Sequence, residues 1–136
     1  MTDITRVASA SIDISTAMFA PQISGLVAGE DLDAVAPCYI KPGDGKVWEA
    51  NGSADNDAAE VVGFTARAVD AGEPVTLFGA GARFKFGSGL TIGAIYFLST
   101  NKGELQTTAS TGDSTGVAKA ITATDIVVIR ANGIGG

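Results

Sequence analysis

Residues 24–29 read SGLVAG and residues 88–93 read SGLTIG, so similar glycine-containing hexapeptides occur twice in a chain of 136 residues. Each copy precedes an apolar segment with a turn glycine, CYIKPGDGKV (38–47) in the first case and YFLSTNKGEL (96–105) in the second. In both segments a glycine stands seven places after the first residue. The shared order predicts two weakly similar β units, about residues 25–80 and 88–131, that bury their apolar faces against each other.

Short apolar or alternating segments between turns fill both units, as is typical of strands. PCYIK (37–41) and KVWEA (46–50) flank PGDG (42–45), which predicts a hairpin. Further strands are expected at 60–69, 74–78, 82–87, 94–100, 105–109, 116–122 and 125–131. No long segment carries a helical stripe, so we expect at most one short helix, in 54–60 or near the N-terminus. The predicted fold class is mainly β, a small barrel-like or sandwich-like body in one domain.

The stretch GSGLTIG (87–93) follows the alternating run RFKF, and a strand before such glycines also occurs at phosphate-binding turns. A phosphate site would need a helix N-terminus next, whereas the following AIYFLST (94–100) is typical of a strand. A nucleotide site also has no reason to occur twice in one small domain. We therefore interpret these glycines as turn residues.

Composition excludes several classes of function. The net charge of -6 argues against binding nucleic acid or an anionic membrane surface, and no apolar run is long enough for a signal peptide or a transmembrane helix. The chain has no histidine and one cysteine, Cys38, which excludes an intramolecular disulfide, Cys/His zinc sites and Ser-His-Asp triads. Cys38 lies in an apolar strand, so a buried, inert thiol is expected. We predict no enzyme activity, no cofactor and no metal.

Two further groups of residues are candidate binding sites. Asp55, Asp57 and Glu60 loosely resemble alternate oxygen ligands for calcium, but the turn glycine and bidentate Glu of an EF-hand are missing, which favours a solvated loop. Tyr39 and Trp48 could form a platform on which a sugar stacks. On a hairpin, such residues are more often anchors of the core or of an interface with another subunit or partner.

Residues 1–24 differ from the remainder because they are rich in Ser, Ala, Thr and Ile and contain no glycine. Ile12 and Ile14 alternate with polar neighbours, which indicates an extended arm able to add a strand to another sheet. The alternative is a partly frayed terminus. We accordingly divide the chain into an N-terminal arm, 1–24, and a single β domain, 25–136.

The segment from Pro37 to Phe86 resembles the lambda-type head decoration (cement) proteins of tailed bacteriophages. The similar stretches are PCYI (37–40), GKVWEA (45–50), the polar loop 51–59, VGFTA (62–66), and VTLF (75–78) to ARF (82–84). The later run from YFLST through NKGEL to GVAKA is similar to related phage head proteins that carry a second copy of the unit.

The resemblance implies a homotrimer that binds the outer surface of the expanded capsid at threefold and quasi-threefold sites. Its partners would be the major capsid protein and itself, and it would be made in the host cytoplasm. Residues 2–16 would be the capsid-binding arm, with Ile4, Val7, Ile12 and Ile14 as its apolar side. Tyr39 and Trp48 are candidate trimer or capsid contacts. The alternative function is a virion surface module, similar to a fibre domain, that recognises host glycans.

Overall fold

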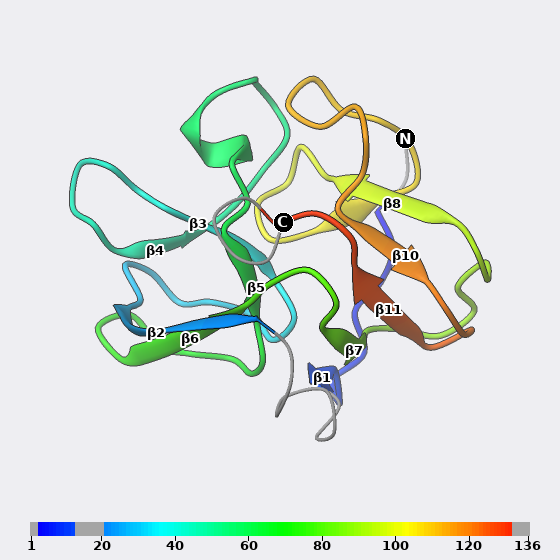
Figure 1. Cartoon of the computed structure of the whole chain (residues 1–136), viewed down its shortest axis with the longest axis horizontal. Coiled ribbons are helices and arrows are strands. Elements are labelled where there is room, and N and C mark those ends of the chain that lie inside the picture. Colours follow the sequence, from blue (N-terminus) through cyan, green and yellow to red (C-terminus); the bar gives the residue numbers. More distant parts are fainter. Residues whose placement is uncertain (1–2, 13–20, 132–136) are drawn as a thin grey trace.

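The structure is a computed structural model that describes residues 3–12 and 21–131. Two antiparallel sheets pack against each other, the first on the left of Figure 1 and the second on the right. The predicted mainly β class is confirmed, and the sheets keep separate edges, so the body is a sandwich rather than a closed barrel. The predicted short helix is also present, as the 3₁₀ helix η1 (Asp57–Ala59).

The described part of the chain contains eleven strands. The first sheet, in the order β2-β6-β5-β3-β4, consists of β2 (Gln22–Val27), β3 (Pro37–Ile40), β4 (Val47–Glu49), β5 (Gly63–Thr65) and β6 (Pro74–Phe78). The second sheet has the order β1-β7-β11-β10-β8-β9. Its strands are β1 (Ser11–Ile12), β7 (Arg83–Lys85), β8 (Ile95–Leu98), β9 (Leu105–Gln106), β10 (Ala118–Ala120) and β11 (Asp125–Val128).

The strand order confirms the duplication that the sequence predicted. Strands β2 to β6 and strands β7 to β11 are connected and paired in the same way, and β1 is added at the β7 edge. The hairpin registers also agree, since Tyr39 lies opposite Trp48 in the first sheet and Phe97 lies opposite Gln106 in the second. We call residues 22–78 the first unit and residues 83–131 the second unit.

The two hexapeptides that suggested the duplication are nevertheless not structurally equivalent. SGLVAG begins within β2, where the register shifts around Gly25, whereas SGLTIG lies in the connection between β7 and β8. The residue equivalent to Gly93 is Val35, because each precedes the second strand of its unit and donates its N–H to the fourth, with φ values of 85° for Gly93 and 53° for Val35. The predicted alignment of the hexapeptides is therefore wrong in register, although it identified the correct pair of units.

The units stack front to back, so equivalent faces do not meet. Ile126 of the second sheet points into the main core, where Phe84 stacks on Phe64 of the first sheet at 5.9 Å between ring centroids. Leu77, the equivalent of Ile126, instead points into a smaller apolar cluster with Cys38 on the far side of the first sheet. That cluster is covered by the segment 28–36, which contributes Ala28, Leu32 and Ala36 to it. The first sheet is therefore buried on both faces.

Candidate functional site

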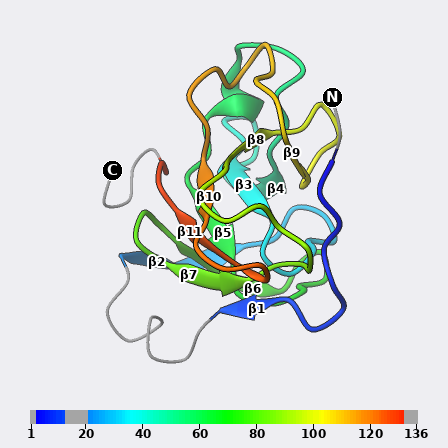
Figure 2. The same ribbon diagram turned by 90° about the vertical axis from the view of Figure 1, so that its right-hand side faces the viewer.

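The N-terminal segment, residues 3–12, lies against the body of its own chain (Figure 2). Ile4 donates its N–H to the Leu105 carbonyl oxygen at 2.9 Å, and Val7 donates to the Phe86 carbonyl oxygen at 2.8 Å. Both side chains are half-buried against the main core. Ile12 belongs to β1 and lies opposite Phe84 in β7.

Gly87 allows this close approach of the N-terminal segment. A Cβ atom at Gly87 would lie 2.6 Å from the Thr5 carbonyl oxygen, which is shorter than any real contact of that kind. A side chain at residue 87 would therefore force the backbone at residue 5 to move, and glycine is required here because of the backbone that passes over it.

Arg6 joins the segment to both units through a largely buried guanidinium group. Its Nη1 lies 2.8 Å from Glu104 Oε2 and 3.7 Å from the Asp33 carboxylate, and its Nη2 donates to the Gly103 carbonyl oxygen at 2.5 Å. The guanidinium also lies 5.2 Å from the centroid of the Phe86 ring. Because Asp33 belongs to the first unit and Glu104 to the second, one side chain connects three parts of the chain.

Glu49 lies beside this junction with its carboxylate packed against Gly103. It accepts a hydrogen bond from the Asp33 N–H at 2.9 Å, while its own N–H donates to Glu30, which is paired with Lys102. Burial, with the nearby charges of Asp33 and Glu30, raises the pKa of Glu49 to about 7. The carboxyl group of Glu49 therefore changes its protonation state near neutral pH.

Tyr39 and Trp48 lie side by side on the β3–β4 hairpin, as predicted, but Trp48 is already engaged by its own chain. The Lys41 Nζ lies 4.4 Å from the centroid of the indole ring, and the indole Nε1 donates to the Asp44 carboxylate at 3.2 Å. The backbone of Gly29 packs against the same ring, so a Cβ there would overlap it. Stacking of a sugar on Trp48 would first have to displace these contacts.

The structure bears on several other sequence predictions. Cys38 is fully buried, as predicted, and burial raises the pKa of its thiol. That the thiol is inert stays a prediction. Within the described ranges, no group of three or more Asp, Glu, Cys or His side chains is arranged to hold a metal ion, and Asp57 instead begins the short helix η1. Ile14 lies outside the described residues. The strand β2 crosses the predicted boundary between arm and domain at residue 24.

Sequence reasoning missed two side chains that organise the structure, Arg6 and Asp113. Asp113 is buried and accepts hydrogen bonds from the N–H groups of Leu98 and Gly116, both at 2.9 Å, and from Arg130 Nη2 at 2.9 Å. It holds the loop 107–117 against the top of the second unit in Figure 1. A lone aspartate among small polar residues gives no sequence signal for such a role.

No protein-family model matches the chain, and no curated protein matches its sequence. In the ranges 3–12 and 21–131, the structure has no helix long and apolar enough to cross a membrane. The functional proposal must therefore rest on the sequence resemblance, the fold and the geometry of the N-terminal segment.

Proposed function

We propose that the protein is a capsid decoration (cement) protein of a tailed bacteriophage. It binds the outer surface of the expanded head as a homotrimer at threefold and quasi-threefold sites, and it stabilises the shell against the pressure of the packaged DNA. Many weak contacts repeated over a shell act together, so no single tight site is needed.

The observation that carries the proposal is the pairing of β1 with the edge of β7. It supports the idea that the arm sequence can extend the edge of a sheet, which is how the resemblance implies that the arm binds the capsid protein. The segment behind the resemblance, residues 37–86, supplies β3 to β7 of the sandwich, so it belongs to the folded body. Only 18% of the residues in the chain are charged, and a surface poor in charge is easier to cover with a partner.

In this proposal the four arm residues have two roles. Ile4 and Val7 pack against the core of their own chain, so in the proposal they anchor the arm to the body. Contact with the major capsid protein is then assigned to Ile12 and Ile14, the apolar residues farther along the arm.

Binding to capsids tests the proposal directly. Purified protein is mixed with expanded, undecorated heads of the phage that encodes it, and the heads are pelleted. Saturation near one trimer for each threefold and quasi-threefold site is the expected result. A protein that ignores the heads but binds host cells or glycans would instead be a surface-binding module.

The arm assignment is tested with a double variant, Ile12→Asp with Ile14→Asp. We expect at least a tenfold loss of capsid affinity with an unchanged melting temperature, because the core anchors Ile4 and Val7 are retained. The matched control is Ser9→Asp with Ser11→Asp, which adds the same charge at neighbouring polar positions and is expected to bind normally. Equal affinity of the Ile12/Ile14 variant and the control would count against the arm assignment.

A further inference from the structure

The outward face of the second sheet carries apolar side chains that pack against neither of the two apolar clusters. Ile95, Phe97 and Val127 are half-buried on this face, while their neighbours Tyr96, Leu98 and Ile126 point into the main core. Ile129 continues the β11 row and is 41% exposed. Strand alternation therefore leaves a mixed apolar face on the side of the second sheet that points away from the main core. The second sheet lies on the right of Figure 1.

Basic residues accompany these apolar side chains. Lys119 lies opposite both Val127 and Ile95 at the centre of the face, and Lys85 and Arg83 lie at its β7 margin. The one acidic residue on these strands, Asp125, is paired with Arg83 at 2.8 Å. We call the set Arg83, Lys85, Ile95, Phe97, Lys119, Val127 and Ile129 the outer face.

The equivalent face of the first sheet is covered by another unit. Phe64 is the equivalent of Lys119, because it lies opposite Phe78 and Pro37 as Lys119 lies opposite Val127 and Ile95. Phe64 is fully buried, and the group that buries it is the second unit of the same chain. Within one molecule, this face of a unit is thus the contact for another unit of the same fold.

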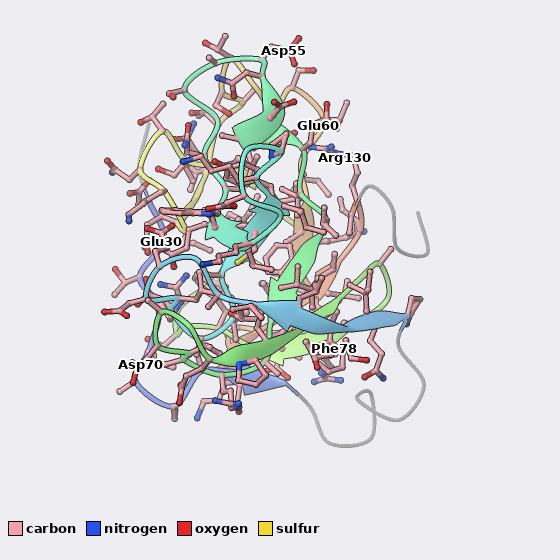
Figure 3. The ribbon with its side chains drawn as sticks, turned by 90° about the vertical axis from the view of Figure 1, so that its left-hand side faces the viewer. Glu30, Asp55, Glu60, Asp70, Phe78 and Arg130 are labelled. Carbon is pink, nitrogen blue, oxygen red and sulfur yellow. The ribbon has the colours of Figure 1, made fainter. Side chains whose placement is uncertain are left out.

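Charge is divided unevenly between the two units. The first unit contains ten acidic and three basic residues, a net charge of -7, while the second contains three acidic and five basic residues, a net charge of +2. On the first unit, Asp31, Asp70 and Glu73 form an exposed acidic patch, in which Asp31 accepts a hydrogen bond from the Ala71 N–H at 2.9 Å. Figure 3 views the side opposite to Figure 2 and shows Asp70 there.

We propose that the outer face binds the acidic side of the first unit of a second copy of this chain, so that the molecules associate head to tail. The contact continues the front-to-back stacking of the units from one molecule to the next, with the segment 28–36 and the acidic patch of the neighbour facing Lys119. Such a contact is heterologous, because two different surfaces meet in it. Copies joined in this way form a closed ring when the rotations from one copy to the next add up to a full turn. The inference deepens the proposed function, of which self-association is one part.

Charge reversal on the two surfaces tests the pairing in purified protein. Association is measured by light scattering after size exclusion and by sedimentation over a range of concentrations. Lys119→Glu and Asp70→Lys are each expected to weaken association at least tenfold, and the chain that carries both is expected to recover most of the loss. Both side chains are exposed, so circular dichroism should show normal folding. The control Lys46→Glu makes the same charge change on the β3–β4 turn and should associate normally.

Ile129→Asp provides an independent probe of the apolar part of the face and is expected to weaken association as well. A native protein that is monomeric at all concentrations, or association that neither Lys119→Glu nor Ile129→Asp weakens, would overturn the inference. If both single charge variants associate more weakly and the chain that carries both changes does not recover association, the head-to-tail pairing would be overturned. A monomer that still binds capsids would contradict this interface alone, whereas an oligomer that does not bind them would contradict the capsid proposal alone.

Discussion

The two units hold their polar loops in different ways at the top of the molecule in Figure 1. In the first unit the loop between β4 and β5 contains the helix η1, which Asn56 caps by accepting a hydrogen bond from the Ala58 N–H. In the second unit the loop between β9 and β10 has no helix and is held by the buried Asp113. Two units of the same topology therefore hold this loop differently, one by a helix cap between neighbouring residues and the other by a buried carboxylate that also bonds a distant strand.

The loops also depend on each other, because Gly112 donates its N–H to the Gly52 carbonyl oxygen at 2.9 Å, and Gly52 donates to the Ser99 carbonyl oxygen at 2.8 Å. A Cβ at Gly52 would overlap Ser110. The two loops differ in structure because each must fit the other loop rather than resemble its own equivalent.

The largest effect is expected for Asp113→Ala. The change leaves the N–H groups of Leu98 and Gly116 without their acceptor and removes the partner of Arg130, so the free energy of unfolding should fall by about 3–5 kcal/mol. Asn56→Ala, which removes the helix cap of the equivalent loop, should cost only about 1 kcal/mol. Urea denaturation measures both, and equal losses would contradict the contrast between the loops.

Arg6→Ala is expected to cost about 2–3 kcal/mol, since it removes charged hydrogen bonds to both units. Hydrogen exchange should also become faster at the Ile4 and Val7 amides, because their segment loses its anchor. The control is Arg67→Ala, an exposed arginine whose side chain bonds the adjacent Ala68 carbonyl oxygen, and it should change stability by less than about 0.5 kcal/mol. Unchanged exchange at Ile4 and Val7 would show that Arg6 does not anchor the segment.

Glu49 gives the first unit a titrating carboxyl group at a position where the second unit has Thr107. Its pKa is raised from the ordinary value of 4.5 to about 7, so between these values the folded state holds a proton that the unfolded state has released. Stability should therefore decrease as pH rises through this window and level off above it. After allowance for solvent screening we expect a decrease of about 1–2 kcal/mol.

The measurement is the difference in unfolding free energy between the native protein and Glu49→Gln at pH 4.5 to 8. The unfolding free energy of Glu49→Gln should increase relative to that of the native protein as pH rises. Asp55 is an exposed acid in the polar loop, so the difference between Asp55→Asn and the native protein should not change with pH. A constant difference for Glu49→Gln would mean that Glu49 ionises normally.

The smallest effect concerns the turn that precedes the second strand of each unit. Gly93→Ala should cost about 1 kcal/mol, because the backbone has φ of 85° and the added Cβ would contact nothing. Gly43→Ala adds a Cβ in equally open space without a positive φ and should have almost no effect. Thermal unfolding of the two variants separates backbone strain from side-chain contact, and equal melting temperatures would contradict the assigned strain.

Much of the fold could be predicted from local patterns. The strand β6 has the predicted bounds, 74–78, and the hairpin 37–50, the helix within 54–60 and the buried Cys38 are all confirmed. These features depend on alternation, turn residues and apolar neighbours, which act over a few residues. The resemblance to decoration proteins and the capsid-binding arm stay predictions.

The sequence by itself determined the class of the fold, the existence of two units and the absence of histidine chemistry. Only the tertiary structure decided that Val35 is the equivalent of Gly93, that Arg6 and Asp113 hold distant segments together, and that the units stack front to back. The reason is that an ion pair or a buried carboxylate depends on groups as far apart in sequence as Arg6 and Glu104. No local pattern determines which face of one sheet packs against which face of the other, because this depends on the packing of the whole chain.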